Sequence, residues 1–150
     1  MKYALSIFCL FLCSLLHAQS EESAIKETIN NFFKGMKTSD TALLISSISP
    51  NAVLQTIVSN KEQKVVVRTE VMSKFIDFVA MPHPLVFDER IQFETIKVDA
   101  DLASVWTPYQ FFLGDKFSHC GVNSFQLVKL DGKWKIQYII DTRRKEKCIE

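Results

Sequence analysis

The stretch LASVWTPYQFFLGDKFSHCGVNSFQLVKLDGKWKIQYIIDT, from Leu102 to Thr142, contains three long β-strand patterns separated by two turn signals. Asp131-Gly132 is a favoured two-residue hairpin turn, and glycine begins the other connection, Gly114-Asp115-Lys116. The patterns predict strands at Leu102–Leu113, Phe117–Leu130 and Lys133–Thr142. Short connections join them, so we expect an antiparallel meander.

The residues before this meander predict three helices, a hairpin and one further strand. Apolar residues recur at helical spacing after Ser20, and we expect that helix to end near Gly35. A second helix begins at Ser39-Asp40 and ends before Pro50, and a third is capped by Thr69. The β-branched runs Val53–Val58 and Gln63–Arg68 predict the hairpin, and Phe87–Val98 predicts a strand with a bend near Glu94-Thr95. Together these elements predict an α+β fold, in which three helices from the N-terminal half pack on one face of a strongly curved antiparallel sheet.

Residues 1–18 have the pattern of a secretory signal peptide. Lys2 supplies a positive charge, Ala4–Leu16 is an apolar run, and a small residue, Ala18, marks the expected cleavage site. An apolar run this short does not cross a bilayer, which needs about 20 residues. A lipoprotein signal at Cys13 is a weaker alternative, because the residue before that cysteine is not small. We therefore expect export to the periplasm or the medium, with no membrane association after cleavage and a single domain at residues 19–150.

The composition of residues 19–150 argues against nucleic-acid binding. Removal of the signal takes away one base, Lys2, and no acid, so that 18 − 1 = 17 basic side chains balance 17 acidic ones. Proteins that bind nucleic acid gain most of their affinity from an excess of positive charge. The basic run Arg143-Arg144-Lys145 is expected to be a solvated tail.

Two cysteines, Cys120 and Cys148, remain after cleavage. An even pair in an exported chain predicts a disulfide, and two free thiols are the alternative. Neither these residues nor the histidines form a metal-ligand set, and no glycine-rich phosphate loop is present. We therefore expect neither a metal nor a cofactor.

Strand alternation divides the meander into two faces. From the Asp131-Gly132 turn, strict alternation places His119, Asn123 and Tyr138 on the apolar inner face, and Asp141 and Arg143 on the outer face.

The facing of Leu102–Leu113 depends on the turn that follows it. A three-residue connection at Gly114 turns the more apolar set, including Thr107 and Tyr109, inward, whereas a two-residue turn would bring Trp106 inside. We favour the first arrangement.

The segments WTPYQFF at 106–112, KFSHCGVNSF at 116–125, GKWKI at 132–136 and DTRR at 141–144 resemble the branch of the nuclear transport factor 2-like superfamily that is described as putative lumazine-binding. The resemblance extends over residues 19–150. It implies a cystatin-like cone, formed by a curved sheet and three helices, with a pocket in the mouth of the cone and a homodimeric assembly. The family carries no agreed catalytic residues, and the fold alone does not settle function.

We predict that the cone binds a small apolar or aromatic molecule, because polar groups interrupt its apolar inner face. The predicted contacts are Thr107, Tyr109, His119, Asn123 and Tyr138. Neighbouring backbone could satisfy these groups instead, and the cluster would then be structural. Two other functions stay open: a cofactor-free isomerase or dehydratase using His119 and Tyr109, and an accessory domain that acts by dimerising. A dyad of His119 with Asp141 is disfavoured because alternation puts them on opposite faces.

Overall fold

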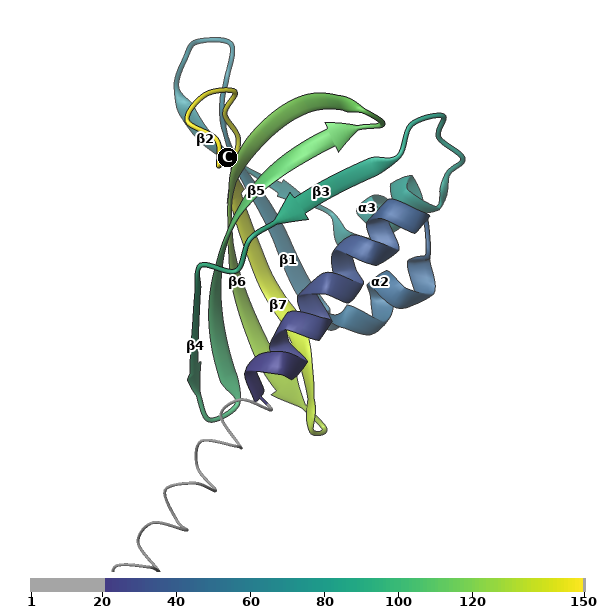
Figure 1. The fold of residues 1–150 in the computed structure, drawn as a ribbon, viewed down its shortest axis with the longest axis vertical. Coiled ribbons are helices and arrows are strands. Elements are labelled where there is room, and N and C mark those ends of the chain that lie inside the picture. Colours follow the sequence, from purple (N-terminus) through teal and green to yellow (C-terminus); the bar gives the residue numbers. More distant parts are fainter. Residues whose placement is uncertain (1–20, 150) are drawn as a thin grey trace, which may run out of the picture.

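The protein is described by a computed structural model over residues 21–149. The predicted signal peptide and Ser20, after which we expect the first helix to begin, lie outside the described residues. Three helices cover the concave face of one curved sheet (Figure 1). They are a helix over residues 21–38, α2 at Thr41–Ser47 and α3 at Met72–Ala80. None of the helices in this range is long and apolar enough to cross a membrane.

The first helix packs on the sheet through one apolar stripe. Its buried residues are Ile25, Ile29, Phe32, Phe33 and Met36. The helix runs three residues past Gly35, where we expected it to end. A Cβ at Gly35 would lie 2.7 Å from the backbone nitrogen of Leu44, so the glycine allows α2 to approach closely. The glycine is therefore a packing residue.

The next two helices begin differently. The helix α2 begins where we expected, and Asp40 caps it, because its carboxylate accepts a hydrogen bond from the Leu43 N–H at 2.9 Å. For α3 the predicted cap is wrong, since Thr69 lies in a strand and the N-cap residue is Val71, which makes no side-chain cap bond.

The sheet has seven strands in the order β2-β1-β7-β6-β5-β3, and β4 also pairs with β5. Their bounds are β1 Ile48–Ser59, β2 Val65–Glu70, β3 Phe87–Ile91, β4 Thr95–Asp99, β5 Leu102–Leu113, β6 Lys116–Leu130 and β7 Lys133–Thr142. The predicted meander is antiparallel throughout, but β1 joins β7 in parallel, so the sheet as a whole is mixed. The α+β class, the three helices and the strong curvature are confirmed (Figure 1).

The strand predicted at Phe87–Val98 is two strands. β3 and β4 both pair with β5, and the chain between them bends at residues 92–94. The backbone N–H groups of Gln92 and Glu94 still donate to β5, at 2.9 and 3.1 Å. The predicted bend is therefore a short break in one continuous edge.

The favoured β5–β6 register is correct, although the turn is not the one we expected. Thr107 pairs with Asn123 and Tyr109 with Gly121. The turn has two residues, since Leu113 pairs with Lys116. Ser118 is bulged out of the pairing, and this extra residue turns the side chains beyond it back to the predicted faces. Trp106 therefore stays outside, with 46% of its surface exposed.

Candidate functional site

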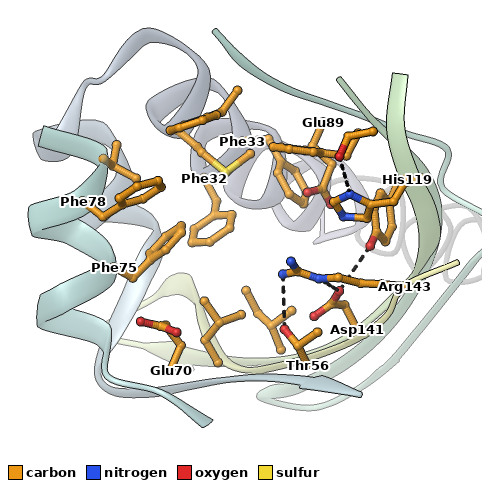
Figure 2. A pocket seen from close by; sticks show the side chains of 18 of the residues that line it. Phe32, Phe33, Thr56, Glu70, Phe75, Phe78, Glu89, His119, Asp141 and Arg143 are labelled. Carbon is orange, nitrogen blue, oxygen red and sulfur yellow. Dashed lines mark hydrogen bonds and ion pairs between the residues drawn. The ribbon is translucent and has the colours of Figure 1, made fainter. Parts of the chain in front are cut away.

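A cavity of about 680 Å³ lies between the helices and the concave face of the sheet. Its helical wall is aromatic and includes Phe32, Phe75 and Phe78 (Figure 2). The rings of Phe32 and Phe75 stack with centroids 6.0 Å apart. Aromatic walls of this kind suit a flat organic ligand.

The opposite wall carries the polar groups of the cavity among apolar residues, and Tyr109 on β5 lies at their centre. The ring of Tyr109 crosses β6 at Gly121, where a Cβ would lie 2.7 Å from the ring and 1.8 Å from the carbonyl oxygen of Thr142. The hydroxyl reaches that carbonyl at 2.9 Å and Asp141 Oδ2 at 3.2 Å. Burial and the carboxylates of Asp141 and Glu89 raise the pKa of Tyr109, so its hydroxyl stays protonated.

A bulge in β7 brings Asp141 to this inner wall. β6 and β7 pair in the predicted register as far as Leu127 and Ile136, and then Gln137 is skipped, so that Gln126 faces Tyr138 and Asn123 faces Asp141. An extra residue reverses the facing of everything beyond it. The strict alternation that we predicted for this strand is therefore wrong past Gln137.

Tyr138 is consequently not a cavity residue. It lies on the convex side beside Gln126, and its hydroxyl donates to Gln55 Oε1 at 2.6 Å. This position corrects the prediction that Tyr138 contacts a ligand.

Arg143 also lies at the cavity rather than in a solvated tail (Figure 2). Its Nε donates to Asp141 Oδ2 at 3.1 Å, and its Nη2 to Thr56 Oγ1 at 3.3 Å. About half of the side chain, 52%, is exposed. The guanidinium therefore neutralises Asp141 at the rim.

Glu89 on β3 is the functional candidate that the sequence reading missed. It lies on the cavity wall, and its Oε1 accepts a hydrogen bond from Asn123 Nδ2 at 2.8 Å. Burial, with the negative charge of Asp141, raises the pKa of Glu89 to about 7, against the opposing effects of Asn123 and Arg143. The sequence does place Glu89 on this wall, because it stands two residues from both Phe87 and Ile91 and so shares their face of the strand.

His119 lies on the cavity wall as predicted, but it is not paired with Asp141. Its Nδ1 is 3.1 Å from Ser118 Oγ, and its ring packs 5.0 Å from Phe111 and edge-on to Tyr109. Burial lowers the pKa of His119, and the nearby charge of Arg143 acts in the same direction. The imidazole is therefore neutral at pH 7.

The remaining predicted contacts lie deeper. Asn123 does not line the cavity itself, but its side chain is hydrogen-bonded to Glu89, which does. Thr107, fully buried beside Asn123, has a hydroxyl with no hydrogen-bond partner among residues 21–149. The structure thus brings Tyr109 and His119 to the cavity wall, places Asn123 and Thr107 behind it, and turns Tyr138 away.

The predicted disulfide between Cys120 and Cys148 is present, with Cα atoms 5.7 Å apart. Cys120 is fully buried and pairs with Arg144 through two backbone hydrogen bonds of 2.8 Å. The C-terminal tail therefore folds back against β6, next to Gly121 and the polar wall.

A curved mixed sheet covered by three helices, with a cavity between them, defines this protein as an α+β cone. Residues 20–138 match the sequence profile of the family described as "Putative lumazine-binding", and the chain belongs to that family. A search of curated protein sequences finds no match.

Solved structures support the fold. A nuclear transport factor 2-like protein of unknown function from Shewanella baltica is 18% identical and superposes with a TM-score of 0.66, over 85% of this chain and 96% of that one. A nuclear transport factor 2-like protein with a cystatin-like fold from Novosphingobium aromaticivorans is 10% identical, with a TM-score of 0.70 over 91% and 90%. A cystatin-like protein of unknown function from Nostoc punctiforme is 14% identical, with a TM-score of 0.62 over 83% and 92%. At these identities the likeness shows the fold alone.

Proposed function

We propose that this protein binds a small, flat aromatic molecule in the cavity of the cone, and that the preferred ligand carries a protonated nitrogen. The observation that carries the proposal is the cavity itself, which joins an aromatic wall to a polar wall holding Glu89 and Asp141. A mainly apolar cavity of several hundred cubic ångströms with a few polar groups is the usual form of a small-molecule site.

The charge of the lining favours a cation. Three carboxylates line the cavity, from Glu70, Glu89 and Asp141, against the single guanidinium of Arg143. Arg143 is already bonded to Asp141, whereas the side chain of Glu89 is bonded, within residues 21–149, only to the neutral amide of Asn123. A cation held between Glu89 and the Phe32–Phe75 pair would gain both charge pairing and contact with aromatic rings.

Three indoles of similar size separate ligand charge from ligand shape. We expect tryptamine, a cation, to bind about tenfold more tightly than tryptophol, which is neutral, and indole-3-propionate to bind most weakly. Isothermal titration at pH 7.5 measures the three affinities, and Glu89→Gln should remove most of the preference for tryptamine. Equal affinities would refute the charge preference alone, whereas no binding by any indole would refute aromatic ligand binding.

The disulfide supports a site of action outside the reducing cytoplasm. Pairs such as Cys120–Cys148 persist in oxidising compartments, which agrees with the export that the first 18 residues predict. N-terminal sequencing of the protein recovered from its host tests this part of the proposal, since cleavage after Ala18 is expected and an intact Met1 in the recovered protein would refute it.

Proton transfer is a second candidate function, and the observation that favours it is the pKa of Glu89, about 7, in a cavity that also holds the Tyr109–Asp141 pair. General bases work best when their pKa lies near the working pH. We expect hydrogen–deuterium exchange at the acidic carbon of 2-tetralone in D₂O to be faster with the protein than with its Glu89→Gln variant, and to rise with pH through about 7. Equal rates for the two proteins would leave binding as the only function proposed.

A further inference from the structure

The two edges of the sheet differ: β2 forms one, and β3 and β4 form the other. On β3, Asp88 binds Lys37 at 2.7 Å and Arg90 at 2.9 Å, and the short strand β4 carries the charged residues Lys97 and Asp99. On β2, five of the six residues are exposed, and Val65 and Val67 expose 74% and 53% of their surface. An uncovered edge with exposed β-branched residues is a template for another strand.

The backbone groups of β2 that point away from the sheet follow from its pairing with β1. The N–H of Asn60 donates to the carbonyl of Lys64 at 2.9 Å, directly beside the Ser59–Val65 pair. In an antiparallel ladder the hydrogen-bonded pairs alternate, so the even-numbered residues of β2 bond to β1. Val65, Val67 and Thr69 therefore direct their N–H and C=O groups outward.

We propose that β2 pairs with β2 of a second copy of this chain, antiparallel and about a twofold axis at Val67. Val67 then exchanges both backbone hydrogen bonds with the partner's Val67, and Val65 does the same with the partner's Thr69. The pairing covers the two exposed valines and extends the seven-stranded sheet into the second copy.

Charge favours this register over the two that neighbour it. With the axis at Val67, Lys64 lies opposite the partner's Glu70, and the same pair forms again across the axis. Moving the axis to Val66 would place Lys64 opposite the partner's Arg68, and moving it to Arg68 would bring two arginines together; directly opposed like charges are destabilising. A further shift toward Thr69 would run Val65 into the partner's α3, which begins at Met72.

The pairing also reaches the cavity. Glu70 lines the cavity mouth and is exposed in the single chain. Among residues 21–149, the side chain of Lys64 pairs only with that of its neighbour Glu62, at 2.9 Å, and both side chains are about 70% exposed, so this pair is worth little. In the dimer the partner's Lys64 sits against Glu70 and adds a positive charge at the mouth of the other copy's cavity.

Cysteine cross-linking tests the axis. Under mild oxidation, Val67→Cys should form a covalent dimer, because the two residues at position 67 face each other within disulfide range. Val65→Cys is the matched control and should stay uncross-linked, since Val65 faces the partner's Thr69 and lies four residues from the partner's Val65. Equal cross-linking of the two variants, or none in either, would overturn the proposal.

Charge reversal tests the register without cysteines. Lys64→Glu and Glu70→Lys should each weaken dimerisation about tenfold by sedimentation analysis, because both symmetric contacts become repulsive. The double reversal should restore the original affinity within about threefold. Circular dichroism checks that the exposed substitutions leave the fold intact. A protein that is monomeric at every concentration overturns the proposal, as does a dimer indifferent to both reversals, which would place the interface elsewhere, such as the convex face around Trp106.

Discussion

The two ends of the β6–β7 ladder have the same strand pairing but bury different kinds of residue on the inner face. At the hairpin end the inner residues are apolar: Leu127 and Ile136 pair and are both fully buried. At the mouth end the inner pair is Asn123 and Asp141, and both are also almost fully buried. Between the two ends lie the bulge at Gln137 and the buried apolar pair Phe125 and Ile139.

The difference separates residues that stabilise the fold from residues that the proposed site would use. Burying a polar group costs free energy unless it is hydrogen-bonded, and burying a charge costs more. An apolar mouth would therefore be more stable than one holding Glu89, Tyr109 and Asp141. The hairpin end shows that this chain can build such an interior, and this contrast is why we propose a binding site at the polar mouth.

The largest expected effect is at the hairpin end. Leu127→Ala should lower the free energy of unfolding by about 2 to 5 kcal/mol, because it leaves a cavity in a closed apolar core. Tryptamine affinity should be unchanged wherever the variant is folded. Urea denaturation and titration measure the two quantities, and a parallel loss of affinity would mean that the ends are not independent.

Loss of the disulfide should lower the free energy of unfolding almost as much, and its local effect should be at the mouth end. Replacing both Cys120 and Cys148 by serine removes a cross-link over 28 residues, which should cost about 3 kcal/mol. Hydrogen exchange should accelerate around Gly121 and the tail, while amides near Leu127 should keep their relative protection. Uniform acceleration along β6 would contradict a tail that holds only the mouth.

The sequence predicted the meander well because its information is local. The Asp131-Gly132 turn has positive φ at both residues, 50° and 74°, and fixes the β6–β7 pairing beside it. The β5–β6 register was also correct, although for the wrong turn, because the apolar preference of the inner face outweighs turn length. The parallel pairing of β1 with β7 was missed, since it joins segments far apart in the chain.

The site was predicted less well because it depends on bulges. One skipped residue, Gln137, moves Asp141 and Arg143 inward and Tyr138 outward. Alternation from the hairpin cannot detect such a skip, and nothing in the composition around Gln137 marks it. Glu89 was missed for a different reason: the pattern of its strand predicted a bend, but no inner face was predicted for that strand.

Gly121 connects the ladder to the site, and its substitution should have an intermediate effect. Gly121→Ala places a Cβ against the Thr142 carbonyl and the Tyr109 ring, so it should cost about 1 to 3 kcal/mol and abolish tryptamine binding. Gly132→Ala is the control at the hairpin end. It meets nothing within 4 Å, so only its φ of +74° opposes it, and it should cost about 1 kcal/mol without affecting binding. If both variants bind tryptamine normally, Tyr109 does not organise the site.

Glu89 should also impose a pH dependence on stability. Its pKa is about 7 in the folded protein against 4.5 ordinarily, so the folded state holds a proton that the unfolded state has lost between these pH values. The stabilisation from this group is complete below about pH 4.5, falls as the pH rises to about 7, and stays lower above it.

Glu89→Gln mimics the protonated carboxyl and keeps an acceptor for Asn123, so the variant should lack this decline. Relative to wild type, it should therefore be more stable at pH 8 than at pH 4. Urea denaturation at the two values gives the difference between the proteins, in which the other titrating groups, Asp88 among them, cancel. If that difference is the same at both pH values, Glu89 is ionised in the folded protein at neutral pH, and the contrast between the two ends rests on Asp141 alone.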